Sequence, residues 1–248
     1  MSGHSKWANI KRRKGAQDAK RGAVFTKIIR ELTVAARLGG AEADSNPRLR
    51  SALAKARGAS MPRDTIQRAI AKGVGAAGGE NYEEIVFEGY GVAGVAIIVE
   101  CLTDNRNRST GDIRFAFTKY GGNLGAPGCV SYMFARKGII RVPAEGVVED
   151  DLMMAALDAG AEDVTNEGDL FEITTAMADL YSCATAIQEA GYETSAVELT
   201  YIPGTMAAIS GKHAQTLLKL VDVLEEHDDV QNVYTNADID EETLAALG

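Results

Sequence analysis

A dense group of lysines and arginines opens this chain and is the first feature that could do chemistry. Residues 3–21 read GHSKWANIKRRKGAQDAKR and contain the only tryptophan, Trp7. Lysine and arginine neutralise phosphates, and an indole ring stacks on bases or wedges into a groove. A solvated charge run is the ordinary alternative, and Trp7 could equally pin the arm to the protein. We interpret residues 1–15, which lack hydrophobic periodicity, as a mobile nucleic-acid-binding arm.

The charge of this arm continues into the residues that follow and then reverses. Residues 1–72 contain 17 lysines and arginines against 5 aspartates and glutamates, whereas the remaining residues contain 9 against 30. Such asymmetry indicates a polyanionic partner for the basic segment, although the whole chain carries a formal net charge of −9. The residues expected to contact nucleic acid are Lys6, Trp7, Lys11, Arg12, Arg13, Lys14, Lys20, Arg21, Lys27, Arg30, Arg63, Gln67, Arg68 and Lys72.

A second polar group, TDNRNRST, occupies residues 103–110 between a predicted strand and a predicted helix. Asn105, Arg106, Asn107 and Arg108 could bind a phosphate or a partner at the helix N-terminus. The favoured interpretation is that this segment caps the helix and solvates its first turn. A hydrolase acting at residues 104–108 is a third hypothesis, but the nearby carboxylates show neither triad spacing nor a paired histidine base.

Two glycine-rich motifs could be taken for nucleotide-binding loops. Residues 89–94, GYGVAG, match G-x-G-x-x-G, but apolar strand-like segments precede and follow them, which predicts a hairpin with positive φ at its glycines. Residues 119–128, KYGGNLGAPG, lack the lysine and hydroxyl residue of a P-loop and fit a helix exit and turn. We therefore expect no affinity for NAD, FAD or ATP and no small-molecule substrate.

Cysteine and histidine usage argues against a metal centre or a disulfide framework. The three cysteines are widely spaced in apolar segments, which predicts buried, reduced thiols; they are Cys101, Cys129 and Cys183. The three histidines are not at ligand spacing with any cysteine; they are His4, His213 and His227. We expect neither a metal nor a cofactor.

The hydropathy pattern predicts a cytoplasmic protein. No run approaches the roughly 18 to 20 apolar residues that span a bilayer, and the N-terminus lacks the apolar region of a signal peptide. With 46% hydrophobic and 25% charged residues, the composition is that of a soluble globular protein.

Helical periodicity dominates the first third of the chain. A helix is expected from about residue 16 to residue 39. A second should open with Asn46 as its N-cap and Pro47 in its first turn, and a third should run from about residue 62 to Gly73. The glycine-rich residues 73–79 then serve as a linker.

Strands and helices alternate beyond the linker. Strands are expected at 84–88, 94–102 and 129–134, with a helix over 107–120. Residues 138–200 follow the strand and helix order of a ferredoxin-like unit, whereas the helix at 211–226 and the strand at 230–236 return to the preceding sheet. The predicted fold is α+β, and its domains are residues 1–78, residues 79–135 with 201–248, and an inserted acidic domain at residues 136–200.

Four stretches of this sequence resemble the YebC family, whose members are described as transcriptional regulators and whose mitochondrial relatives are translational activators. The stretches are GHSKWANIKRRKGAQDAKRGAVFTKIIRE, NPRLRSALAKAR, IVECLTDNRNRS and KYGGNLG. The resemblance covers essentially the whole chain and implies a helical domain, two α+β domains, a role in gene expression and no enzymatic activity. Where the family hairpin usually reads GYGPGG, this chain has Val92 and Ala93.

These observations predict a non-enzymatic DNA-binding transcriptional regulator. The main alternative is a ribosome-associated translation factor that binds ribosomal RNA and assists elongation through proline-rich stretches. Residues 136–200 contain 3 basic and 14 acidic residues and should repel phosphates, so the α+β domains could face a basic protein instead.

Overall fold

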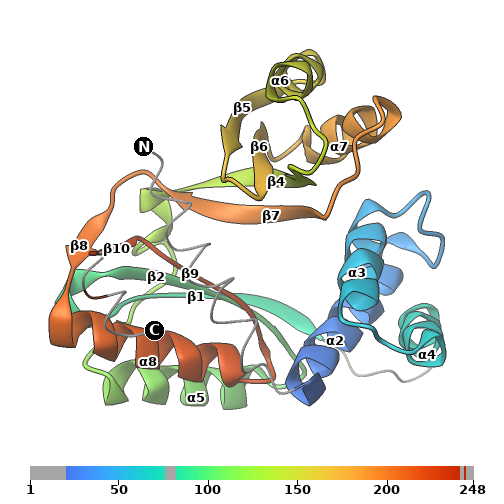
Figure 1. The fold of residues 1–248 in the computed structure, drawn as a ribbon. Helices are drawn as coiled ribbons and strands as arrows, with labels where there is room; N and C mark the ends of the chain where they lie inside the picture. Colours follow the sequence, from blue (N-terminus) through green and yellow to red (C-terminus); the bar gives the residue numbers. More distant parts are fainter. Residues whose placement is uncertain (1–20, 76–81, 241–242, 244–248) are drawn as a thin grey trace.

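The protein consists of a helical unit and two antiparallel sheets, each sheet carrying two helices (Figure 1). The structure is a computed structural model, which describes residues 21–75, 82–240 and 243. The predicted α+β class is therefore confirmed. Within the described ranges, every helix is too short or too polar to cross a bilayer.

The helical unit contains three helices whose ends are set by local sequence signals. They are α2 (Arg21–Gly39), α3 (Pro47–Gly58) and α4 (Arg63–Val74). Asn46 caps α3 as predicted, since its side-chain oxygen accepts from the Leu49 backbone N–H at 3.0 Å. A Cβ atom on Gly73 would lie 2.4 Å from the Thr33 carbonyl oxygen, so glycine lets α4 approach α2 closely.

The first sheet has the strand order β3-β1-β2-β9 and is covered on one face by two helices. Its elements are β1 (Glu83–Tyr90), β2 (Ala96–Thr103), α5 (Arg106–Lys119), β3 (Asn123–Leu124), α8 (Gly211–Glu226) and β9 (Val230–Thr235). β9 pairs antiparallel with β2, which confirms that the end of the chain returns to this sheet. A separate parallel pair joins β8 (Ala207–Ile209) to β10 (Ala237–Ile239).

The second sheet has the strand order β5-β6-β4-β7, and all its neighbouring strands are antiparallel. Its elements are β4 (Phe134–Pro143), α6 (Glu149–Asp158), β5 (Ala161–Asn166), β6 (Leu170–Ala176), α7 (Leu180–Glu189) and β7 (Ala196–Pro203). Two crossover helices thus connect strands that are not neighbours, which is the predicted ferredoxin-like arrangement. The apolar sides of α6 and α7 meet this sheet in one buried cluster that contains Ile140, Leu152 and Ile187.

The strand predicted at residues 129–134 is wrong. A turn followed by a 3₁₀ helix, η2 (Ser131–Met133), occupies this segment. The buried carboxylate of Glu88 accepts from the backbone N–H groups of Gly128, Val130 and Ser131 at 2.8 to 2.9 Å. Burial alone raises the pKa of Glu88, but these donors lower it below its ordinary value. The backbone is therefore satisfied by a side chain and not by a neighbouring strand.

The predicted thiol environments are confirmed for two cysteines and corrected for the third. Cys101 and Cys183 are buried, and burial raises the pKa of both thiols. Cys129 lies in the turn organised by Glu88 and is only half-buried. All three thiols are free, as the sequence predicted.

The GYGVAG motif is a hairpin loop, as predicted. β1 and β2 are antiparallel, with Tyr90 opposite Ala96 beside the loop and Glu83 opposite Thr103 at the far end. A 3₁₀ turn at residues 92–94 joins the two strands. The predicted positive φ is found at Gly94, with 75°, but not at Gly89 or Gly91. Ala93 instead adopts the left-handed region with φ 57° and ψ 23°. An L-residue in this region is strained because its Cβ crowds the following carbonyl oxygen.

Replacing Ala93 by glycine should relieve this strain and raise the free energy of unfolding by about 0.5 to 1 kcal/mol. Chemical denaturation of the two proteins at one temperature measures the difference. Ala126→Gly is the control, since Ala126 lies in an exposed turn without positive φ and its replacement should destabilise the chain slightly. A lower stability for Ala93→Gly would contradict the assignment of strain.

Candidate nucleic-acid interface

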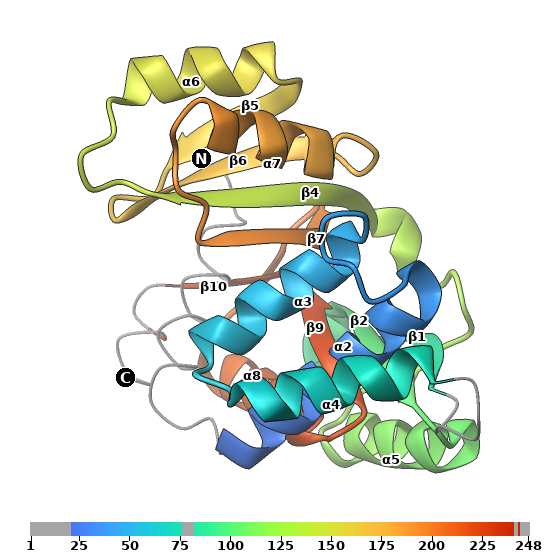
Figure 2. The same cartoon turned by 90° about the vertical axis from the view of Figure 1, so that its right-hand side faces the viewer.

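Several basic residues of α3 and α4 are exposed to solvent. Figure 2 shows these two helices next to one another on the side turned toward the viewer. Arg50, Arg57, Arg63 and Arg68 are exposed, and within the described part of the chain none of them forms an ion pair. We call these four side chains the arginine face. Gln67 and Lys72 are also exposed on α4.

Two residues predicted to contact nucleic acid, Lys27 and Arg30, are directed into the protein instead. The ammonium group of Lys27 donates to the backbone carbonyl of Glu225 at the end of α8. The Arg30 guanidinium donates to the Asp229 carboxylate at 2.5 Å and to the Leu102 carbonyl at 3.4 Å. Its side chain is only 13% exposed, so Arg30 joins the helical unit to the first sheet.

Other basic residues of the helical unit are also used in contacts with the acidic body. The Arg48 guanidinium binds Glu31 within the unit at 2.7 Å and also contacts Glu84 of β1. The Lys55 ammonium lies 3.3 Å from Glu198 of β7, in the second sheet. Part of the positive charge of the helical unit therefore holds this unit against both sheets.

The remaining predicted contacts fall where the structure is not described in full. The arm residues Lys6, Trp7, Lys11, Arg12, Arg13, Lys14 and Lys20 lie outside the described residues. Arg21 begins α2.

The loop at residues 103–110 is the N-terminus of α5, and the predicted cap is confirmed. The side-chain oxygen of Asn105 accepts from the Arg108 backbone N–H at 3.1 Å. Arg106 forms an exposed ion pair with Glu83 at 2.8 Å, and Asn107 is exposed. Sequence reasoning thus identified the correct local role of this segment.

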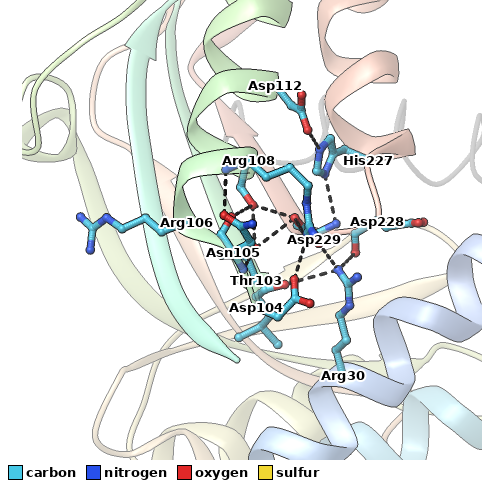
Figure 3. A network of polar contacts seen from close by, with 12 residues as sticks. Arg30, Thr103, Asp104, Asn105, Arg106, Arg108, Asp112, His227, Asp228 and Asp229 are labelled. Atoms are coloured by element: carbon cyan, nitrogen blue, oxygen red, sulfur yellow. Dashed lines mark hydrogen bonds and ion pairs between the residues drawn. The ribbon is translucent and has the colours of Figure 1, made fainter. Parts of the chain in front are cut away.

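The same loop also surrounds a buried carboxylate, that of Asp229 immediately before β9 (Figure 3). The Ser109 hydroxyl donates to it at 2.6 Å, the Thr103 hydroxyl at 3.1 Å and the Arg108 guanidinium at 2.9 Å. With Arg30 from α2, four side chains donate to one carboxylate that is 2% exposed. We call Asp229 and these four donors the carboxylate junction.

The junction determines the protonation of Asp229. Burial alone raises the pKa of this carboxyl, but the hydrogen bonds from Ser109 and Arg108 and the charge of Arg30 lower it to about 2. Asp229 is therefore an anion at neutral pH and neutralises positive charge from two arginines.

His227 supports the turn that carries Asp229. Its Nδ1 atom accepts from the Asp229 backbone N–H at 3.1 Å, so its Nε2 atom carries the proton and donates to Asp112 at 3.2 Å. Sequence reasoning missed both His227 and Asp229. The only local signal was the charged stretch EEHDD before the last strand, and it does not reveal which cations these side chains bind.

The surface beside the junction is a poor phosphate site. It is an open depression that Arg30 and Arg108 line together with four acidic residues and one histidine, namely Asp104, Glu226, Asp228, Asp229 and His227. Both arginines already donate to Asp229, and a phosphate would meet the surrounding carboxylates. The geometry therefore favours the capping interpretation of residues 105–108 over phosphate binding.

Comparison with known proteins places this architecture in a family. Residues 5–76 match the family model described as the TACO1/YebC protein N-terminal domain, and residues 82–237 match the model of the TACO1/YebC second and third domain. The chain belongs to the TACO1/YebC family. The boundary between the two models falls at the glycine-rich segment that follows α4.

Relatives of the TACO1/YebC family match along the full length of the chain. Proteins named "Probable transcriptional regulatory protein" from Desulforapulum autotrophicum and Magnetococcus marinus are 53% and 54% identical, and each alignment covers 100% of this chain and at least 99% of the relative. The crystal structure of a conserved hypothetical protein from Aquifex aeolicus superposes with a TM-score of 0.82 at 47% identity, and covers 92% of this chain and 94% of that one. The arrangement of a helical unit and two α+β sheets is thus shared with a solved structure.

Replacing Asp229 by asparagine should reduce the free energy of unfolding at pH 7 by about 3 kcal/mol, because two arginines lose their buried counter-charge. The folded-state pKa of Asp229 lies below its unfolded value, so the ionised carboxylate stabilises the protein above about pH 4. This contribution, about 2 kcal/mol, is lost as the pH falls toward 2. Urea denaturation at several pH values should therefore show a steeper acid loss in the parent than in Asp229→Asn.

Asp104→Asn is the matched control, since Asp104 binds the same Arg108 at 2.7 Å but is 39% exposed. Its replacement should cost about 0.5 kcal/mol or less. Equal stabilities for the two variants, or an unchanged acid profile in Asp229→Asn, would contradict the role assigned to the junction.

Proposed function

We propose that this protein is a nucleic-acid-binding regulator of gene expression and that residues 1–78 carry its binding surface. The observation that supports this most is the arginine face: four exposed arginines on two adjacent helices, without ion pairs among the described residues, although other cations of the unit are paired. Exposed arginines without ion-pair partners on one small helical unit are the electrostatic footprint of phosphate binding. The basic arm adds positive charge to the same unit.

The charge of the remaining domains supports one orientation on a polyanion. We propose that residues 79–135 with 201–248 form one α+β domain and that residues 136–200 form an inserted acidic one. The inserted domain contains 14 acidic and 3 basic residues, so a phosphate backbone is repelled from it and directed toward the helical end.

The proposed activity is binding without catalysis. The hydrolase hypothesis requires a base near residues 104–108. Asp104 is paired with Arg108 at 2.7 Å, and the adjacent Asp229 has a pKa of about 2 and accepts from four side chains. Such a carboxylate is too weak a base to abstract a proton at neutral pH. Ser109 is buried and donates directly to this carboxylate, so it is not poised as a nucleophile.

DNA is the partner suggested by the names of the relatives, which are called transcriptional regulatory proteins. The α3–α4 pair offers a helix-turn-helix arrangement in which α4 would enter a major groove. Its exposed side chains for base readout are Arg63, Gln67 and Arg68, and Arg68 also donates to the Asp64 carbonyl at 3.2 Å. This set is small for stringent selection of a promoter.

That limited readout set favours a second candidate function, a ribosome-associated translation factor that binds ribosomal RNA and assists elongation through proline-rich stretches. A surface that contacts phosphates without reading base edges serves RNA as well as DNA. The arm and the arginine face would then act on both polymers chiefly through charge.

Replacing Arg63 and Arg68 by alanine together should weaken binding to every nucleic acid tested, because two phosphate contacts are lost. The slope of log affinity against log salt should fall by about 1 to 2 units on duplex DNA. Replacing Lys11, Arg12, Arg13 and Lys14 together should act in the same way and more strongly. Fluorescence anisotropy over a range of salt concentrations measures both effects.

The control removes the same charge from the α+β body through Lys212→Ala and Lys219→Ala, which are exposed on α8. Affinity and salt slope should stay close to those of the parent. A loss equal to that of the Arg63/Arg68 variant would show that the helical unit is not the binding surface.

Competition between DNA and ribosomes distinguishes the two candidate functions. We expect the parent to prefer a candidate promoter over scrambled DNA by less than about a thousandfold, which is below the usual range for specific regulators. A larger preference that the Arg63→Ala/Arg68→Ala variant alone abolishes would establish α4 as a specific reader. Ribosome binding that persists at salt concentrations where DNA binding is lost would favour the translation factor.

A further inference from the structure

Helix α6 of the acidic domain presents large apolar side chains to solvent. Met154 is 63% exposed, Leu157 is 52% exposed, and Val148, which immediately precedes the helix, is 61% exposed. Met154 and Leu157 are three residues apart and therefore lie next to one another on the same side of α6. Contiguous exposed apolar groups of this kind mark an interaction site more often than a random surface.

The exposed apolar side chains of α6 do not belong to the buried cluster that holds this helix to its sheet. The opposite side of α6 buries Leu152 and Ala156 in the cluster beneath the helix. The helix is therefore apolar on two sides, although a surface helix needs only one apolar stripe to hold it to a sheet. The exposed stripe that contains Met154 and Leu157 therefore has no role in holding α6 to the sheet, and another molecule could cover it.

The charges around this stripe indicate the chemistry of that occupant. Residues 142–211 contain 14 aspartates and glutamates and no lysine or arginine. The exposed carboxylates of Asp150 and Asp151 lie in the first turn of α6, and that of Asp158 lies at its end. The apolar stripe is thus bordered by acidic groups at both ends of the helix.

We propose that the exposed side of α6 is a docking site for a basic amphipathic segment of another protein. An apolar side chain of that segment would cover Met154 and Leu157, and its lysines or arginines would meet Asp150, Asp151 and Asp158. Burial of the two apolar groups provides affinity, and the flanking carboxylates select for positive charge.

Other occupants fit this surface less well. Nucleic acid is repelled by the carboxylates, and a second copy of the same surface would bring like charges together. The start of α2, where the basic arm joins the described chain, lies at the opposite end of the molecule from α6 (Figure 1). The proposal does not depend on the arginine face, which lies on other helices.

The test uses the full-length protein and a labelled helical peptide of leucines and lysines, about 14 residues long, with its leucines on one face. We expect saturable binding, and we expect Met154→Gln with Leu157→Gln to weaken it at least about tenfold. Phe115→Gln is the matched control, because Phe115 is 67% exposed on α5 and its replacement should leave peptide affinity unchanged. Circular dichroism establishes that the variants are folded.

The contribution of charge is tested by Asp150→Asn with Asp151→Asn, which should weaken peptide binding and reduce its salt dependence. Glu42→Gln with Asp44→Asn removes two exposed carboxylates from the helical unit and should have no effect. Binding of an all-lysine peptide as tight as that of the amphipathic peptide would overturn the proposal, since no apolar site would then be needed. A peptide of residues 1–20 that binds more tightly and loses affinity in the Met154/Leu157 variant would also overturn it, because the occupant would be the chain's own arm.

Discussion

The ion pair between Arg30 and Asp229 connects the helical unit to the rest of the protein, and much of the structure is arranged around it. Asp229 is buried, and a buried carboxylate remains ionised only if strong donors replace the water that it has lost. Arg30 supplies one such donor from α2, while Arg108 and Ser109 supply others from α5. The ends of β2 and α8 and the start of β9 converge on this point, so its geometry fixes where the helical unit lies.

Polar contacts join the helical unit to the two sheets, whereas the two sheets also share an apolar cluster that contains Ile98, Phe134 and Tyr201. The described helical unit, the first sheet and the second sheet each contain a separate buried cluster. Ion pairs such as Arg48 with Glu84 and Lys55 with Glu198 join the helical unit to the sheets. Exposed pairs of this kind stabilise weakly, so the buried junction provides the principal ionic constraint. Cations that bind the body are unavailable to a nucleic acid, and we therefore propose the arginine face for that role.

The family's DNRNRS motif illustrates how a polar sequence can suggest a ligand site and yet serve the fold. Asn105 caps α5, Arg108 binds two carboxylates, and Ser109 completes the donors around Asp229. Each of these side chains is of a type that binds phosphate in other proteins. Here their hydrogen-bonding capacity is directed toward a partner far along the chain, so the segment is best understood as part of the junction between domains.

The sequence by itself determined the elements whose signals are local. Hydrophobic periodicity and the Asn46-Pro47 cap predicted the helices, alternation predicted the ferredoxin-like order, and the strands that flank GYGVAG predicted a hairpin. Residues 129–134 were assigned wrongly because an apolar run resembles a strand, whereas the carboxylate that organises the turn belongs to Glu88 on another strand. Only the tertiary structure decided which basic residues face solvent. Arg30 and Asp229 are 199 residues apart in the chain, and the pairing of charges depends on distance in space, which a linear pattern does not contain.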